Sequence, residues 1–319
     1  MKRRSFLTLL TATTANALAS TSTLAKLARR RFQTDVSRLA PPEGQAAAGT
    51  VRFVAIGDMG TGDDNQFAIA SRLATYYNDH PYDSILTLGD NIYPDGDPSN
   101  FQTKFERPYD ALLKRGVKFH AVLGNHDVRR GREAQVNYKP FNMNGRAFYS
   151  FTKGDGLVDF FAIDSNDFDQ AQERWLEGAL AASQARWKLA YFHHPIYSSA
   201  RRHGSDTKLR AKLEPLFARY GVAAGFSGHD HTYERTRAQQ GVQYFVSGVG
   251  GQLRRGDLDR RSPFLLAGND EVNSFLFVEI TRDQLSFRAV DATGRILDSG
   301  TLAPREAVRA KAATGERIR

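Results

Sequence analysis

Short apolar runs recur through the central part of the chain, and each of them is followed by a small polar cluster. Five of these runs have the length of a strand and cover residues 51–56, 84–88, 117–123, 187–192 and 222–227. Between them, apolar residues recur at three- and four-residue spacing, which predicts amphipathic helices. We expect these helices at about 64–79, 101–115, 169–184 and 206–220. Strands that alternate with helices predict an α/β fold with parallel strands.

Two segments depart from this alternation. Residues 147–152 and 157–163 predict a hairpin, and residues 241–300 predict short strands separated by glycine-rich turns. The body of the chain contains no internal repeat and no low-complexity stretch. We therefore expect a single catalytic domain over residues 49–303, preceded by a polar, alanine-rich linker at 26–48.

The first 25 residues are typical of a targeting segment. A basic start is followed by a mildly apolar, threonine-rich stretch and by Ala17-Leu18-Ala19, the layout of a signal peptide. The pair Arg3-Arg4 resembles a twin-arginine signal, and cleavage after Ala19 or Ala25 fits the pattern. We expect a bacterial protein exported through the twin-arginine route to the periplasm or the medium. A disordered basic N-terminus is the alternative, and the apolar stretch is too short to span a membrane.

The positive charge lies at the two ends of the chain. The formal net charge is +9, but residues 1–40 hold eight basic residues against one acidic one, and residues 304–319 hold five against two. The body is therefore nearly neutral, which argues against a nucleic-acid partner and favours a basic C-terminal tail at 304–319. The sequence has no cysteine, so any metal site must use oxygen and nitrogen ligands.

The polar clusters after the five strands contain residue types that bind metal ions. In order they are Gly57-Asp58, Gly89-Asp90-Asn91-Ile92-Tyr93, Gly124-Asn125-His126-Asp127, His193-His194-Pro195 and Gly228-His229-Asp230-His231. A single Gly-Asp pair after a strand is often only a turn. Five such clusters at the carboxyl ends of strands are expected to converge on one site. Two histidines two residues apart, as in the last cluster, point the same way on extended chain and can reach a metal pair.

This ordered set resembles the calcineurin-like metallophosphoesterases and, among them, the small purple acid phosphatases of the tartrate-resistant type. The resemblance covers about residues 50–300 and implies a four-layer α/β/β/α sandwich. Many members carry Asp-x-His at the first motif, whereas Asp58-Met59-Gly60 lacks that histidine. Tyr93, three residues after Asp90, instead matches the tyrosinate ligand of the purple branch.

The resemblance implies a centre of two metal ions, Fe(III) and a divalent Fe, Zn or Mn ion. The first ion would be held by Asp58, Asp90, Tyr93 and His231, and the second by Asp90, Asn125, His193 and His229, with Asp90 bridging the two. The His-x-Pro spacing selects His193 over His194. A metal-bound hydroxide would attack phosphorus in line, and His126 would bind phosphate and protonate the leaving group.

Other features of the same loops leave alternatives open. His203 resembles a further active-site histidine of the small members, although its flank, Arg201-Arg202, departs from the family pattern. These two arginines could attract anionic substrate, but a solvated charged loop is the plainer interpretation. The glycines of residues 246–251 lack the Lys-Ser/Thr of a nucleotide-binding loop.

The favoured function is hydrolysis of phosphate monoesters, on phosphorylated small molecules or phosphoproteins. A phosphodiesterase or nucleotide-cleaving enzyme with the same centre is the first alternative, because these motifs build the metal site and not the substrate pocket. A non-catalytic, metal-dependent phosphate-binding protein is the second. The sequence gives no indication of an oligomeric state.

Overall fold

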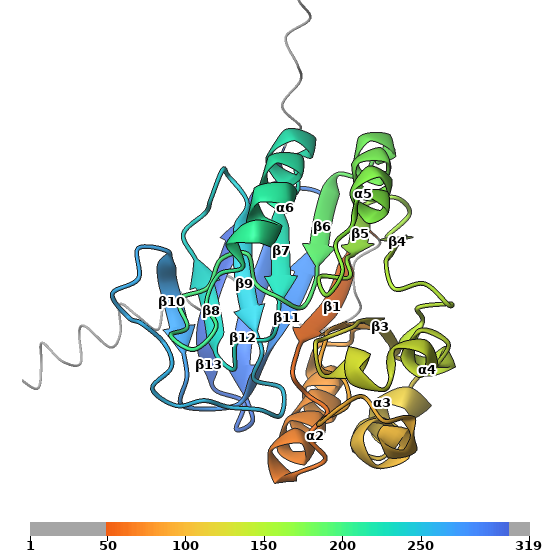
Figure 1. Cartoon of the computed structure of the whole chain (residues 1–319). Helices are drawn as coiled ribbons and strands as arrows, with labels where there is room; N and C mark the ends of the chain where they lie inside the picture. The colour runs from red at the N-terminus through yellow and green to blue at the C-terminus, as the bar shows by residue number, and fades with distance from the viewer. Residues whose placement is uncertain (1–48, 306–319) are drawn as a thin grey trace, which may run out of the picture. The chain divides into compact units, whose positions relative to one another are not determined.

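A computed structural model of the protein describes residues 49–305. The expected signal peptide and linker lie outside the described residues, as does the expected C-terminal tail from residue 306 onward. Figure 1 shows the described part as two β-sheets with helices beside them.

The first sheet has six strands in the order β13-β12-β11-β1-β2-β3. Three strands from the N-terminal half run parallel: β1 (Val51–Ile56), β2 (Ser84–Leu88) and β3 (Lys118–Val122). Three from the C-terminal end continue the sheet in antiparallel fashion: β11 (Ser274–Ile280), β12 (Leu285–Asp291) and β13 (Ile296–Leu302). β1 is central and apolar on both faces, so it is buried along almost its whole length.

The second sheet has seven strands in the order β10-β8-β9-β7-β6-β5-β4. β4 (Tyr149–Lys153) and β5 (Val158–Ala162) form the expected hairpin. β5, β6 (Trp187–Tyr191), β7 (Ala224–Ser227) and β9 (Gln243–Ser247) run parallel. β8 (Tyr233–Thr236) and β10 (Leu265–Asn269) close the far edge in antiparallel fashion.

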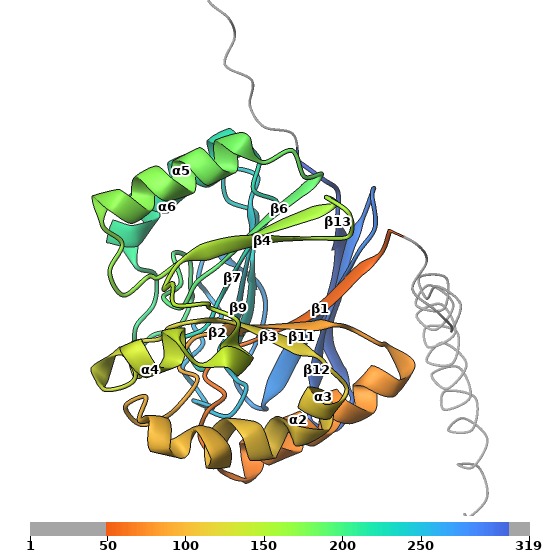
Figure 2. The ribbon, with the colours of Figure 1, turned by 90° about the vertical axis from the view of Figure 1, so that its right-hand side faces the viewer.

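Helices cover the outer faces of both sheets, which confirms the expected four-layer α/β/β/α sandwich (Figure 2). α2 (Asp64–Asp79) and α3 (Arg107–Lys114) lie on the first sheet, and α5 (Gln170–Ala182) and α6 (Thr207–Tyr220) on the second. Aromatic rings pack edge to face between the sheets, with Phe53 of β1 5.2 Å from Phe160 and 5.8 Å from Phe226. A second cluster, including Leu176 and Phe217, fills the space between the second sheet and its helices.

Local sequence signals set the ends of these helices. Asp63, Asp169 and Asp206 each precede a helix and accept a hydrogen bond from a backbone N–H in its first turn. Gly221 ends α6 in the left-handed conformation that glycine adopts without strain. These caps explain why the expected and observed helix boundaries agree within one or two residues.

The structure adds detail that the apolar pattern alone did not give. Of the five strands with polar ends, three belong to the first sheet and two to the second, as a sandwich of two sheets requires. The expected helix at 101–115 begins with π-helical Gln102–Glu106 and becomes α-helical as α3, and short helices, among them α4 (Arg132–Val136), follow β3. Apolar periodicity reports burial but not which sheet a strand joins, so it could not make this distinction.

Two further observations concern the edges of the described region. Arg305, near the start of the expected basic tail, donates hydrogen bonds to the carbonyl oxygens of Val222 and Gln240 and so lies against the domain. None of the helices within residues 49–305 has the length and apolar character that crossing a bilayer requires.

His120 makes stability of the domain sensitive to acid. Its ring stacks on Phe151 at 4.0 Å between centroids, and burial lowers the pKa of its imidazole to about 4. The folded protein therefore resists protonation of a group that titrates near 6.5 when unfolded. The contribution of His120 to the free energy of unfolding is therefore present above pH 6.5. About 3 kcal/mol of it is lost as the pH drops from 6.5 to 4.

The variant His120→Phe should keep the stacking and lose this proton linkage. We expect its melting temperature to fall less steeply than that of wild type between pH 6.5 and pH 4. Melting curves of both proteins over this range measure the difference. Parallel curves would show that His120 does not contribute to acid sensitivity.

Candidate metal centre

The five polar clusters lie in the loops that follow β1, β2, β3, β6 and β7, and backbone hydrogen bonds connect these loops. The amide of Asp58 donates to the carbonyl of Gly89 at 3.0 Å, and the amide of Gly228 donates to His193 at 3.1 Å. The Gly57 amide donates to Ser247 at 2.8 Å and so joins the two sheets at this edge. All seven side chains predicted to be ligands are thereby brought together.

Three of these seven residues have a left-handed backbone. The φ angles of Asp58, Asp90 and His229 are 55°, 52° and 69°. Residues other than glycine pay on the order of 1–3 kcal/mol for such a conformation, and it clusters at functional sites. In this backbone conformation, the side chains of Asp58, Asp90 and His229 join the cluster of donor atoms just after their strands end.

The first group of donor atoms comprises Asp58, Tyr93 and His231. The Tyr93 hydroxyl lies 2.9 Å from Oδ1 of Asp58 and 3.3 Å from Nε2 of His231. Nε2 of His231 lies 3.4 Å from the same carboxylate oxygen. A phenol, a carboxylate and an imidazole therefore meet at one point.

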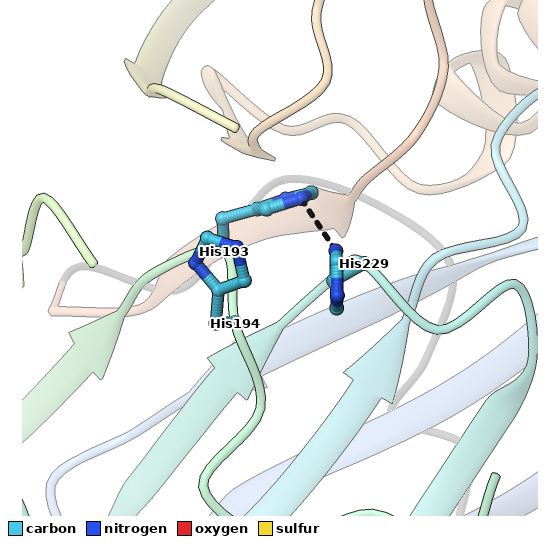
Figure 3. A group of neighbouring side chains, drawn as sticks. All are labelled: His193, His194 and His229. Atoms are coloured by element: carbon cyan, nitrogen blue, oxygen red, sulfur yellow. Dashed lines mark hydrogen bonds between the residues drawn. The ribbon is translucent and has the colours of Figure 1, made fainter. Parts of the chain in front are cut away.

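The second group comprises Asn125, His193 and His229. Oδ1 of Asn125 lies 3.0 Å from Nε2 of His193 and 3.0 Å from Nδ1 of His229. The two ring nitrogens face each other at 3.2 Å, as the dashed line in Figure 3 marks. Asp90 lies between the two groups, because oxygen and nitrogen atoms of Asp58, Asp90 and His193 are all within 4.8 Å of one another.

The second group has more acceptor atoms than protons. Nδ1 of His193 donates to the carbonyl of Leu88 at 2.8 Å, so its Nε2 carries a lone pair. That lone pair faces an amide oxygen and another ring nitrogen, and at most one proton, on Nδ1 of His229, can lie among the three atoms. A cation at this point would satisfy all of them.

The donor distances also fit metal coordination. Two donors about 2.1 Å from one ion lie about 3.0 Å apart at a right angle and about 3.4 Å apart at the tetrahedral angle. Distances within the first group run from 2.9 to 3.4 Å. Those among the three atoms of the second group run from 3.0 to 3.2 Å. Both groups could therefore hold an ion each without rearrangement.

Electrostatics in the absence of cations oppose ionisation of this cluster. Burial and the neighbouring Asp90 carboxylate hold the pKa of Asp58 well above its usual range, and burial with both carboxylates raises the pKa of Tyr93. Burial lowers the pKa of His193 and, with Arg254, lowers that of His231 to about 4. The 3.6 Å contact of His193 with Asp90 is therefore not an ion pair. Bound cations would reverse these shifts, since they favour anionic oxygens and neutral imidazoles.

Ser165 determines which nitrogen of His194 carries a proton. Its hydroxyl oxygen accepts hydrogen bonds from the backbone amides of His193 and His194 at 3.2 and 3.0 Å. Both lone pairs are then used, so its single proton goes to Nδ1 of His194 at 2.9 Å. Nε2 of the neutral ring must therefore be protonated and cannot bind a metal. The hydrogen bonds therefore favour His193 over its neighbour as a candidate ligand, although both rings lie beside His229 (Figure 3).

His126 lies on the open side of the centre. Its amide donates to Oδ1 of Asp90 at 2.9 Å, and its ring packs on Tyr93 with centroids 4.6 Å apart. Nδ1 donates to the carbonyl of Pro94, so Nε2 is the nitrogen free to take up and release a proton. That nitrogen lies 4.0 Å from Asp90, and the side chain is 26% exposed.

The other predicted catalytic histidine, His203, belongs to an exposed loop. Its ring lies 4.4 Å from that of His229, so the loop after β6 places it beside the second donor group. Burial and the nearby Arg254 and Arg202 lower the pKa of its imidazole. Both histidines predicted to act on substrate therefore border the cluster of metal donors, on different sides.

Asp127 fixes the two loops that carry Asp90 and Asn125. Its buried carboxylate accepts hydrogen bonds from the amides of Asn91, Ile92 and Gly124 at 2.8–3.0 Å, and from the side chain of Gln135 at 2.8 Å. The sequence singled out Asp127 only as a member of the third polar cluster, because nothing in the spacing reveals that α4 supplies a partner. Ser165 was missed for the same reason.

Gly60 allows the loop of Tyr93 to approach β1. A Cβ atom at position 60 would lie 1.8 Å from the carbonyl oxygen of Asn91, which no side chain permits. The carbonyl of Gly60 accepts the amide of Tyr93 at 2.9 Å. Only glycine at position 60 leaves room for the loop that brings Tyr93 into the first group. The absence of a histidine at position 60 and the place of Tyr93 are therefore linked.

The sequence of this chain is similar to that of several phosphatases. The family model described as calcineurin-like phosphoesterase matches residues 51–233. Tartrate-resistant acid phosphatase type 5 of Rattus norvegicus is 30% identical over 295 residues, which cover 79% of this chain and 90% of that protein. Purple acid phosphatase 7 of Arabidopsis thaliana is 29% identical over 306 residues, which cover 85% and 92%.

A solved structure agrees at the level of the fold. The purple acid phosphatase PPD1 from seeds of yellow lupin (Lupinus luteus) superposes with a TM-score of 0.70 at 19% identity. The superposition covers 83% of this chain and 55% of the lupin chain. The likeness therefore extends across the two-sheet domain.

Proposed function

Because this chain belongs to the calcineurin-like phosphoesterases, in the branch of the purple and tartrate-resistant acid phosphatases, we propose that it hydrolyses phosphate monoesters at a centre of two metal ions. The chain is an enzyme of the acid phosphatase class, and its substrates are phosphorylated molecules. The observation that carries the proposal is the pair of donor groups that share Asp90.

In this proposal each donor group holds one ion. Asp58, Tyr93 and His231 would hold Fe(III), Asn125, His193 and His229 would hold a divalent Fe, Zn or Mn ion, and Asp90 would be a ligand of both. Phenolate and carboxylate are hard donors that suit Fe(III), whereas imidazole suits the divalent ion. When bound, the ions would supply an activated water as nucleophile and stabilise negative charge on the phosphate.

His126 is the residue we assign to the leaving group. Its Nδ1 is fixed by Pro94, so a proton held on Nε2 is directed toward the centre. There it would donate to a phosphate oxygen and then to the departing alkoxide. His203, on the other side of the second donor group, would bind the phosphate.

The variant His126→Asn should separate protonation of the leaving group from binding. We expect kcat to fall about 10²-fold or more for an alkyl phosphate, and much less for 4-nitrophenyl phosphate. Nitrophenolate departs without a proton and so does not need the acid. Steady-state kinetics on both substrates measure the difference. His120→Phe, which replaces a histidine of β3 outside the centre, is the matched control and should keep both rates. Equal losses on both substrates would exclude the acid role.

Ester preference tests the proposed reaction itself. Purified protein without its first 25 residues should hydrolyse 4-nitrophenyl phosphate faster than bis(4-nitrophenyl) phosphate between pH 4 and 8, with its maximum on the acid side. A preference for the diester, or activity only above neutral pH, would contradict the monoesterase proposal and favour a phosphodiesterase with the same centre. Absence of hydrolysis with both metals bound would favour a phosphate-binding protein.

Export is a separate proposal that rests on the sequence of residues 1–25 alone. We expect the full chain to reach the periplasm or the medium through the twin-arginine route. Replacement of Arg3 and Arg4 by lysine should retain the enzyme in the cytoplasm, and unchanged export would refute the route.

A further inference from the structure

Two arginines border the centre on the side of His203 and His231. Arg202 directly precedes His203, and its side chain is exposed. The amide of Arg254 donates to the carbonyl of His231 at 3.2 Å, so this second arginine is attached to the loop of a proposed ligand. The two come from segments far apart in the sequence.

Asp257 joins these two segments into one rim. Its buried carboxylate accepts the amide of Arg202 at 2.9 Å and lies 3.7 Å from Nη1 of Arg254. Its carbonyl accepts the amide of Arg201 at 2.8 Å, and Ala200 forms a β-bridge with Leu258. The loop that carries His203 is therefore braced and not free.

The positive charge of this rim is only partly neutralised within residues 49–305. Arg201 pairs with Asp259 at 3.5 Å and donates to the carbonyl of Gly256 at 2.8 Å, so it is used in the brace. The guanidinium of Arg202 makes no ion pair or hydrogen bond with the described residues. Nη1 of Arg254 is buried and has no hydrogen-bond partner there, since Asp257 stays at 3.7 Å. Oδ2 of Asp257 is also buried without a hydrogen-bond partner, so the two groups form only a loose ion pair, and Nη1 of Arg254 keeps the capacity to donate to a further acceptor.

Both arginines are attached to residues that border the centre. Arg202 is next to His203, whose ring lies 4.4 Å from that of His229, and the amide of Arg254 donates to the carbonyl of His231. The Asp257 carboxylate contacts the guanidinium of Arg254 at 3.7 Å but only the backbone amide of Arg202. The rim therefore presents positive charge that is only partly neutralised next to the proposed phosphate site.

We propose that Arg202 and Arg254 form an anion subsite beside the metal centre, which selects phosphate esters carrying a second phosphate or carboxylate group. Arginine presents several donors in a planar fork that matches the oxygens of such groups. This inference rests on the proposed phosphatase activity, and it reverses the simpler interpretation of residues 201–202 as a solvated loop.

Matched substrates test the subsite. The bisphosphates of ethanediol, propanediol and butanediol are compared with the monophosphates of the same diols, which have similar leaving groups and lack the second charge. After correction for two equivalent phosphates, we expect kcat/KM to be about tenfold higher for at least one bisphosphate, because one charge-assisted contact contributes about that much. The preference should weaken as ionic strength rises.

Variants locate the effect. Arg202→Gln and Arg254→Gln should each lower the ratio of bisphosphate to monophosphate kcat/KM about three- to tenfold, and the double variant should bring it near one. Arg261→Gln is the matched control, because Arg261 follows Arg254 in the same loop and its substitution removes the same charge. Its side chain is 90% exposed and lies 3.7 Å from Asp259, outside the proposed subsite. It should leave the ratio unchanged.

Three results separate the possible failures. A ratio near one in the wild type, with the monophosphates still hydrolysed, would overturn the subsite alone. An equal loss of preference in Arg261→Gln would show a general charge effect and would also overturn it. If no monophosphate of any length is hydrolysed by protein with both metals bound, the phosphatase proposal fails, and the subsite fails with it.

Discussion

The variant Asp90→Asn is expected to lose at least about 10³-fold in kcat and to retain fewer than two metal ions per chain. Asp90 stands between both donor groups, with Oδ1 3.6 Å from Nε2 of His193 and the carboxylate near that of Asp58. Asparagine keeps the shape and can still accept the amide of His126, but it lacks the negative charge that two cations share. Metal analysis and turnover of 4-nitrophenyl phosphate, measured on the same sample, test this.

The matched control lies at the other end of the same strand. Asp83 directly precedes β2, whereas Asp90 follows it, and the side chain of Asp83 is 71% exposed. Asp83→Asn removes the same charge and should leave metal content and kcat unchanged. Full activity with two bound ions in Asp90→Asn would contradict the bridging role.

The second large effect is expected from Gly60→Ala. The added Cβ would lie 1.8 Å from the carbonyl oxygen of Asn91, so the loop that carries Tyr93 must move. Tyr93 would then leave the first donor group, and kcat should fall about 10²-fold or more, since a displacement of 1 Å costs about that much. A protein that is purple or pink through a tyrosinate–Fe(III) bond should also lose its colour. Visible absorption and kinetics on the iron-loaded protein measure both effects.

Gly178→Ala serves as the control for this substitution. Gly178 lies within α5, and an added Cβ there meets no atom within 4 Å. Alanine is favoured over glycine inside a helix, so this variant should be as active as wild type and slightly more stable. An unchanged spectrum in Gly60→Ala would refute the steric coupling between Gly60 and Tyr93.

Much of the fold follows from local patterns. The β1 and β2 boundaries and those of α2 match the apolar runs closely, because buried strands and capped helices leave clear signals. The distribution of strands over two sheets could not be derived from periodicity, since β11 pairs with β1 although more than 200 residues separate them. The family resemblance, and not the pattern, supplied the four layers.

The candidate site shows the same division. Residues that follow neighbouring parallel strands, such as Asp58 after β1 and Asp90 after β2, could be predicted to meet, because the ends of such strands share an edge. The supporting residues could not. Ser165, Asp127 and Arg254 act through hydrogen bonds or charges that span different loops, and their sequence neighbours carry no trace of these partners.

The proposed centre also explains why its residues tolerate strain. Left-handed Asp58, Asp90 and His229 and several buried acceptors are unfavourable for the protein alone. Binding of two cations would offset these costs, as expected for a metal site whose affinity is coupled to folding. Removal of the metal should therefore lower the melting temperature as well as the activity.

The most direct test of the two-ion centre is a titration of metal-depleted protein. Fe(III) and a divalent ion are added in steps while hydrolysis of 4-nitrophenyl phosphate is followed and the bound metal is counted. We predict that activity rises with the second ion and reaches its maximum at two ions per chain. Full activity with one ion, or with none, would contradict the proposed centre.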